Sequence, residues 1–190
     1  METLETIMTR RSIGKVKPER PPKEWIERLL DAAVQAPNHH ITEPWRFYVL
    51  AGKAREDLGR VMAEALRPRL EDPAGEKGRA LLAKEAEKPL RAPVLIAVAA
   101  KDSDNPKVVP IEDVEATAAA VENLLLSAHD QGLAAMWRTG DAAYDAHVKE
   151  FLGLRPEDHL LGFIYVGYPD ATPAPRRRSA EGKVEWRGWE

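Results

Sequence analysis

The sequence predicts an α+β fold in which a central sheet is covered by helices on both faces. Segments with apolar residues at helical spacing outnumber the strand-like segments, and helices separate the predicted strands. One run, Val94 to Ala100, is apolar at every position, as in a strand that is buried on both sides. With 190 residues, of which 44% are hydrophobic, the chain can bury a sizeable core. These features favour a sheet between two helical layers.

Helices are predicted wherever apolar residues recur at spacings of three and four. In chain order these segments are 4–10, 26–34, 58–66, 80–87, 114–128 and 144–152. Strands are predicted where short apolar runs lie between turn-forming residues. In chain order they are 47–50, 94–100, 133–137 and 160–166.

Several predicted elements end at residues that stop regular structure. Pro37 and Pro68 follow the second and third helices, because a proline removes a hydrogen-bond donor and restricts the residue before it. Gly132 and Gly153 follow the last two helices, and Gly132 occupies a typical C-cap position. Residues 71–91 are charged and contain proline and glycine, so we expect a mobile excursion around the fourth helix.

The composition restricts the possible functions. A net charge of −3 gives no general attraction to nucleic acid or anionic membranes. Without cysteine there is no disulfide, thiolate metal ligand or cysteine nucleophile. The acidic N-terminus is not a signal peptide, and the longest apolar run is too short to cross a bilayer, so we expect a cytoplasmic protein. No repeat or linker divides the chain, so residues 1–190 should form one domain in which 169–190 are an extended tail.

A basic turn follows the first helix. Arg10, Arg11 and Ser12 place two guanidinium groups and a hydroxyl close together. Such a group can bind a phosphate through forked, charge-assisted hydrogen bonds. Arginines at the end of a helix can also serve only to complement its dipole. Both interpretations are open at this point.

Two adjacent histidines, His39 and His40, lie on the polar turn before the first strand. They do not predict a metal site, because no third ligand lies nearby at a recognisable spacing. We expect hydrogen-bonding histidines on an ordered turn, one of which could face a ligand.

The third apolar strand leads into Trp137, Arg138, Thr139 and Gly140. A strand end with an arginine, a hydroxyl and a flexible glycine resembles an anion-binding site, and the tryptophan offers a flat apolar face. A core tryptophan beside a surface arginine would explain the same residues.

The tail combines the arginine triplet 176–178 with Trp186 and Trp189. Such a mixture can bind single-stranded nucleic acid, but the acidic net charge and the lack of an RNA-binding motif disfavour that role. A tail that lies across an acidic neighbouring subunit is the better account. The motifs of dinucleotide-binding folds, P-loop proteins, serine hydrolases and zinc proteases are missing, which disfavours cofactor-free hydrolysis and phosphoryl transfer.

Three motifs together resemble those of the nitroreductase family, closest to its short YdjA type. They are Arg-Arg-Ser at 10–12, Ala-Pro-x-His-x-x-x-Glu-Pro-Trp-Arg-Phe at 36–47, and Trp-Arg-Thr-Gly at 137–140. The resemblance implies a three-layer α-β-α sandwich with a central mixed, mostly antiparallel sheet. It also implies a homodimer with FMN at the subunit interface. Members of this family pass two electrons from NAD(P)H to nitro compounds, quinones or related acceptors, which implies ping-pong kinetics.

The resemblance implies cofactor-binding residues but no catalytic side chain and no metal. The phosphate and ribityl chain of FMN would be held by Arg10, Arg11 and Ser12, and the same pocket would be completed by Trp137, Arg138 and Thr139. Gln35 and His39 match positions that family members lend to the flavin of the other subunit. Arg177, in the tail, is the candidate for a further phosphate contact.

The sequence departs from the family pattern in the 35–47 region. Gln35 stands where the short type often has arginine, and Ile41 replaces a common polar residue. Glu43 stands where glutamine usually precedes Pro-Trp, and a carboxylate near the ring would disfavour a negatively charged reduced flavin. Two alternatives remain open: the same fold with flavin-fragmenting or dehalogenating activity, and a non-enzymatic flavin-binding dimer.

Overall fold

The computed structural model describes residues 2–174 and 178–189. Its helices are α1 (Thr3–Thr9), α2 (Lys23–Ala33), α3 (Lys53–Leu66), α4 (Glu76–Ala86), α5 (Pro110–Asp130) and α6 (Ala146–Phe151). Single 3₁₀ turns are η1 (His39–Ile41), η2 (Arg67–Arg69), η3 (Lys88–Arg91) and η4 (Asp141–Tyr144). The strands are β1 (Trp45–Ala51), β2 (Val94–Ala100), β3 (Ala134–Arg138) and β4 (His159–Gly167).

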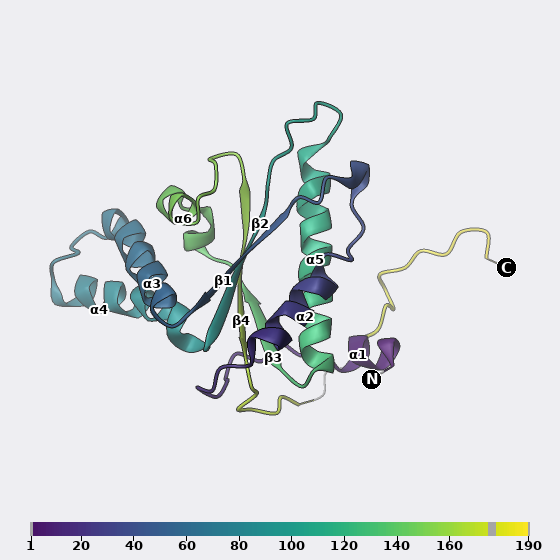
Figure 1. Cartoon of the computed structure of the whole chain (residues 1–190), viewed down its shortest axis with the longest axis horizontal. Coiled ribbons are helices and arrows are strands. Elements are labelled where there is room, and N and C mark those ends of the chain that lie inside the picture. Colours follow the sequence, from purple (N-terminus) through teal and green to yellow (C-terminus); the bar gives the residue numbers. More distant parts are fainter. Residues whose placement is uncertain (1, 175–177, 190) are drawn as a thin grey trace.

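The sheet lies between two helical layers, as the sequence predicts. Helices α2 and α5 cover one face, and α3, α4 and α6 lie on the other (Figure 1). Buried apolar side chains form one cluster on each face. In the central strand β2, Val94, Ile96 and Val98 belong to the cluster under α2 and α5, while the residues between them belong to the other cluster. Every residue of β2 is therefore buried, which confirms the predicted two-sided strand.

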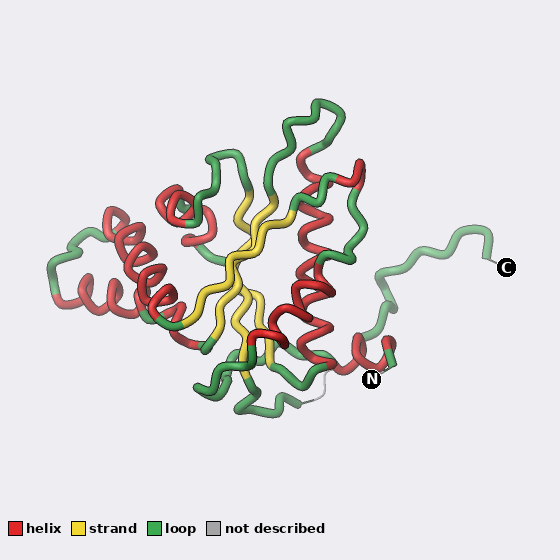
Figure 2. The backbone as a smooth tube through the Cα atoms, viewed as in Figure 1, coloured by secondary structure: helices red, strands yellow, loops and turns green. Residues whose placement is uncertain are grey.

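The strand order is β1-β2-β4-β3, and all three pairings are antiparallel. The sheet crosses the middle of the molecule (Figure 2). A parallel bridge between Ser12 and Ala135 adds the N-terminal segment to the edge strand β3. The predicted α+β, nitroreductase-like fold is confirmed. Among the described residues, the only parallel pairing of the sheet is this bridge.

Most element boundaries differ from the sequence-based ones by a few residues. Helix α3 begins at Lys53, five residues before the predicted start at 58. The prediction missed this first turn because it is charged, faces solvent and carries no apolar stripe. Residues 71–91, expected as an excursion, contain α4, which approaches α3 so closely that a Cβ at Gly59 would overlap the carbonyl oxygen of Ala86. Tyr144 lies outside α6, because the side chain of Asp145 caps that helix by accepting a hydrogen bond from the His147 amide.

The long helix α5 connects the parts of the molecule that matter for the site. Turn η1 lies beside its N-terminal end and α1 beside its C-terminal end (Figure 1). Beyond residue 177 the tail runs away from the sheet and helices, on the side of α1 and α5 (Figure 1). No helix in the described ranges is both long enough and apolar enough to span a membrane.

Candidate functional site

The N-terminal segment is attached to the free edge of strand β3. Ser12 forms a bridge with Ala135, and the Ile13 amide donates a hydrogen bond to the Ala135 carbonyl oxygen at 3.2 Å. Farther along, the Lys17 amide donates to the Tyr168 carbonyl oxygen at 2.9 Å. These bonds hold the Arg-Arg-Ser turn beside the strand that ends in Trp-Arg-Thr-Gly. Two motifs that are far apart in the sequence are therefore neighbours in space.

Gly14 makes this close approach possible. A Cβ at this position would lie 2.8 Å from Met136 Sδ and 3.1 Å from Arg138 Nη2. Any larger residue would push the segment away from β3, because such distances are shorter than normal van der Waals contacts. The glycine therefore lets the main chain of the N-terminal segment lie directly against the end of β3.

Arg10 presents a guanidinium group at this edge with most of its donors unused. Its Nε donates a hydrogen bond to Glu122 Oε1 of α5 at 3.2 Å, and the side chain is 24% exposed. Within residues 2–174 and 178–189 this is the only hydrogen bond of the Arg10 side chain. The two Nη groups therefore remain available for a forked interaction with an oxyanion.

His129, near the C-terminal end of α5, belongs to the same basic corner. Its Nε2 lies 2.9 Å from the hydroxyl oxygen of Thr9. Burial, together with the positive charges of Arg10 and Arg11, lowers the pKa of His129 below its ordinary value, although Asp130 opposes this. Burial is the larger cause of the lowered pKa of His129, and the two arginines add to it.

Arg11 serves the end of helix α1. Its Nη1 donates hydrogen bonds to the carbonyl oxygens of Met8, Thr9 and Arg10, at 3.4, 3.3 and 2.7 Å. These carbonyls lie in the last turn, where a cation also complements the helix dipole. For Arg11, these contacts agree with the capping interpretation. Ser12, one residue farther on, is exposed.

Trp137 and Arg138 point to opposite faces of the sheet, as neighbours on a strand do. Trp137 packs against the cluster under α2 and α5. The Arg138 guanidinium lies on the other face, 5.6 Å from the centre of the Tyr165 ring. The side chains of Arg10 and Arg138 therefore do not meet within one chain. The Arg138 side chain instead lies against Gly14 of the N-terminal segment.

A β-bulge fixes the tryptophan. The register between β2 and β4 shifts at Leu161, whose carbonyl oxygen accepts a hydrogen bond from Trp137 Nε1 at 3.0 Å. The next residue, Gly162, has a φ of 132°, and a Cβ there would overlap the Arg138 carbonyl oxygen. Only glycine suits this position, because it has neither the conformational restriction nor the Cβ.

A cavity of about 260 Å³ opens on the Arg138 side of the sheet. Its lining includes Lys88, Arg91, Arg138, Thr139 and Tyr165. Burial raises the pKa of Tyr165, while the charges of Arg138 and Arg91 act in the opposite direction. Arg10 and Ser12 are not part of this lining.

The histidine turn lies at the other end of α5. His39 Nδ1 is 2.9 Å from Glu112 Oε2, and its ring stacks on that of His40 with ring centres 4.0 Å apart. The Thr42 hydroxyl donates a hydrogen bond to the buried Asp113 Oδ1 at 2.6 Å. The interpretation as hydrogen-bonding histidines on an ordered turn thus agrees with these contacts.

The backbone of this turn is strained. His40, Ile41 and Glu43 have positive φ values of 56°, 55° and 43°. Positive φ costs a residue with a side chain about 1–3 kcal/mol, so the surrounding contacts must enforce the conformation. Gln35, at the start of the turn, is exposed and donates from Nε2 to the Asp31 carbonyl oxygen at 3.1 Å. Strain of this kind is typical of a turn whose side chains must be held in place for binding.

The sequence-predicted residues thus form two groups in one chain. Arg10, Arg11 and Ser12 lie beside the edge strand β3, while Gln35 and His39 lie elsewhere. Their contacts on α5, Glu122 and Glu112, are ten residues apart, which is about 15 Å along a helix. Arg177 lies outside the described residues.

Sequence reasoning missed the partners of these residues. Glu112, Glu122 and His129 all lie on α5, far in the sequence from the turns that they contact. No local pattern could identify them, because a helix surface carries many charged residues with no distinguishing spacing. Gly14 carried a local signal, since a glycine just after a candidate binding turn can mark a close approach of the backbone.

The fold and this edge site define a class of proteins: an antiparallel sheet between helical layers, with a basic N-terminal turn added to its edge strand. Residues 7–168 match the nitroreductase family, and the chain belongs to that family. It is 33% identical over 170 residues to "Putative NAD(P)H nitroreductase YdjA" of Escherichia coli, covering 89% of each chain. The predicted family and its YdjA type are therefore confirmed.

Solved structures show the same fold. The nitroreductase-like family protein of Bacillus cereus superposes with a TM-score of 0.84 at 26% identity, covering 99% of this chain and 97% of that one. A nitroreductase of Desulfovibrio desulfuricans, solved in complex with FMN, superposes with a TM-score of 0.74 at 24% identity, covering 100% and 99%.

Proposed function

We propose that this chain is an FMN-dependent oxidoreductase that transfers two electrons from NAD(P)H to nitro compounds, quinones or similar acceptors by a ping-pong mechanism. The observation that carries the proposal is the bridge between Ser12 and Ala135, which brings the Arg10–Ser12 turn beside strand β3 and sets Gly14 against the Arg138 side chain. The name of the relative YdjA and the FMN in the Desulfovibrio structure agree with it.

The residues at this edge fit the phosphate end of FMN. Arg10 has two free Nη groups in the described part of the chain, which suits bidentate binding of a phosphate. Arg10 and Arg11 both act on His129 as positive charges, so a phosphate at this corner would meet cations. Gly14 lets the segment after the turn lie directly against the Met136 and Arg138 side chains. Arg10 and Ser12 would therefore hold the phosphate and the ribityl chain.

The other residues would orient the flavin ring. Trp137, Arg138 and Thr139 would contact it from the end of β3, where the Arg138 guanidinium lies against Gly14. Gln35 and His39 would reach the flavin of the partner, because in their own chain they lie away from Arg10. When bound, FMN supplies the hydride acceptor and two-electron carrier, and the protein supplies its position and electrostatic environment. No side chain is required as a nucleophile.

We propose a homodimer with residues 1–190 as one domain. Large apolar side chains are exposed on the side of α1, η1, α5 and the tail, and such surfaces mark interfaces. They are Leu4, Ile7, Met8, Ile41, Val109, Ile111, Trp186 and Trp189. The tail from residue 169 would pack on the partner, where Arg177 would contact the phosphate. Because NAD(P)H is a reductant of the cell interior, we place the reaction in the cytoplasm, with no nucleic acid or membrane partner.

An absorbance spectrum tests the proposal. Purified protein should be yellow, and anaerobic NADH or NADPH should bleach the flavin band. Subsequent addition of a nitroarene or a quinone should restore it, with FMN recovered intact on denaturation. Fragmented flavin would instead indicate a flavin-destroying enzyme, and flavin that neither nicotinamide reduces would indicate a non-enzymatic carrier. Colourless protein that cannot be reconstituted with FMN would rule the proposal out.

A further inference from the structure

The turn between α2 and β1 is attached to the first turn of helix α5. The Thr42 hydroxyl donates a hydrogen bond to Asp113 Oδ1 at 2.6 Å, and His39 Nδ1 lies 2.9 Å from Glu112 Oε2. Turn η1 lies beside this end of α5 (Figure 1). Two neighbouring residues of one helix therefore hold both ends of the segment 39–42.

Asp113 is an unusual residue to find inside this protein. Its side chain is only 3% exposed, and its Oδ2 has no hydrogen-bond partner among the described residues. No other buried carboxylate oxygen in that part of the chain lacks a partner. Burying an unpaired oxygen of a charged group is unfavourable. The bond to Thr42 and the N-terminal end of α5, which favours negative charge, offset part of this cost.

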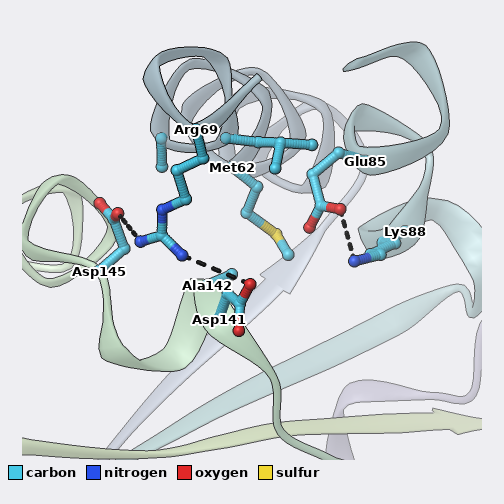
Figure 3. Close-up of a pocket in the computed structure, with 9 residues that line it drawn as sticks. Met62, Arg69, Glu85, Lys88, Asp141, Ala142 and Asp145 are labelled. Atoms are coloured by element: carbon cyan, nitrogen blue, oxygen red, sulfur yellow. Dashed lines mark hydrogen bonds and ion pairs between the residues drawn. The ribbon is translucent and has the colours of Figure 1, made fainter. Parts of the chain in front are cut away.

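Other buried carboxylates use both of their oxygens. Asp145 Oδ2 contacts Arg69 at 2.6 Å (Figure 3), and its Oδ1 caps α6. Both oxygens of Asp158 accept hydrogen bonds from Arg155. Ion-pair networks therefore explain the first two residues as parts of the structure. Within the described ranges Asp113 has no cation, and the one donor that it has comes from a turn.

The turn that Asp113 contacts has a conformation that is unfavourable by itself. His40, Ile41 and Glu43 have positive φ values, which residues with a side chain rarely adopt. Burial does not compensate at Ile41, whose side chain is 83% exposed. The hydrogen bond from the Glu43 amide to Asn38 Oδ1 lies within the turn. The bonds to α5 are therefore the contacts that fasten this strained segment to the helical layer.

We propose that Asp113 and Thr42 are positioning residues for the flavin site. Their hydrogen bond holds turn η1 in the conformation in which His39 meets the flavin ring of the partner subunit. This inference rests on the proposed function, in which His39 serves that flavin. The Glu112 carboxylate can only accept, so Nδ1 of a neutral His39 is the donor, and Nε2 is left as an acceptor for the ring.

Titration of the flavin-free full chain with FMN and with riboflavin, followed by flavin fluorescence, tests this role. Thr42→Val keeps the shape of the side chain and removes its hydroxyl. Both dissociation constants should rise about tenfold or more, because a charge-assisted bond is lost and only molecules with an ordered turn bind. Loss of a phosphate contact would instead weaken FMN alone. Thr42→Ser, the matched control, keeps the hydroxyl and should stay within about twofold of the unmodified protein.

A double-mutant cycle tests whether the two residues act together. Asp113→Ala should weaken both flavins about as much as Thr42→Val, and the double variant should be little weaker, because both changes remove the same bond. Losses that multiply would overturn the proposal, as would a Thr42→Ser variant that binds as weakly as Thr42→Val. A lower melting temperature of Thr42→Val with unchanged flavin affinity would show a purely structural bond and would also overturn it.

Amide hydrogen exchange in flavin-free protein separates this inference from the proposed function. The Thr42 and Glu43 amides donate hydrogen bonds inside the turn, and Thr42→Val should speed exchange of residues 38–43 about tenfold or more. Exchange in helix α4, on the other face of the sheet, should not change. If the unmodified chain binds no flavin, the proposed function fails, and the exchange rates still decide whether the pair holds the turn. If Thr42→Val binds flavin as tightly as the unmodified chain, only this inference fails.

Discussion

Replacing Arg10 by glutamine is expected to weaken FMN binding far more than it weakens the fold. Arg10 contacts Glu122 at 3.2 Å, with side chains that are 24% and 48% exposed. An ion pair so accessible to solvent contributes at most about 1 kcal/mol to the free energy of unfolding. A charged hydrogen bond to a phosphate is worth about 1.5–3 kcal/mol, which corresponds to about 10- to 150-fold in the dissociation constant.

Riboflavin, which lacks the phosphate, provides the decisive comparison. Apo-protein is titrated with FMN and with riboflavin, and quenching of flavin fluorescence measures each dissociation constant. Arg10→Gln should raise the dissociation constant of FMN at least about tenfold and leave that of riboflavin nearly unchanged. Arg28→Gln, an exposed arginine on α2, is the matched control and should change neither. Glu122→Gln should strengthen FMN binding, because it removes the carboxylate that competes for Arg10.

Two results would refute this reasoning. If Arg10→Gln weakened FMN and riboflavin equally, Arg10 would not act through the phosphate. If the variant also had a much lower melting temperature, Arg10 would be a structural residue that holds α1 on α5. A fall of several degrees in the melting temperature, measured by circular dichroism without flavin, would reveal that second case.

Three further outcomes follow from the geometry. Gly162→Ala should lower the free energy of unfolding by about 1–3 kcal/mol or more and shift the fluorescence of Trp137, because φ is positive and a Cβ would overlap the Arg138 carbonyl oxygen. An unchanged free energy of unfolding in urea would contradict this conformation of Gly162. The pKa of His129, followed by NMR, should rise in Arg10→Gln, because a neighbouring positive charge is removed. Because folding lowers this pKa, the free energy of unfolding decreases as the pH falls below about 6.5. The variant should therefore lose less of that free energy on acidification than the unmodified protein. Glu43→Gln should raise the flavin reduction potential, because it removes a negative charge near the ring; an unchanged potential would place Glu43 away from it.

The order of helices and strands could be predicted from the sequence, because each depends on a local pattern. The two-sided burial of β2 is visible in a run of apolar residues from Val94 to Ala100. Helix starts were less accurate, because the first turn of α3 is charged and carries no apolar signal.

The candidate site could be predicted only in part. Arg10 and Ser12 belong to a short motif and can be found locally, and the alternation along β3 implies opposite faces for Trp137 and Arg138. Contacts between distant segments could not be found, such as Arg10 with Glu122. They depend on how α5 packs beside α1, and one sequence contains no record of which surface charges become neighbours.

Sedimentation velocity of the FMN-reconstituted protein, recorded at the visible flavin absorbance, tests the central claim most directly. We predict that all protein-bound flavin sediments with a species of twice the 21.2 kDa chain mass, at one FMN per chain. Flavin that travels with single chains, or dimers that carry no flavin after reconstitution, would contradict a cofactor site shared between two subunits.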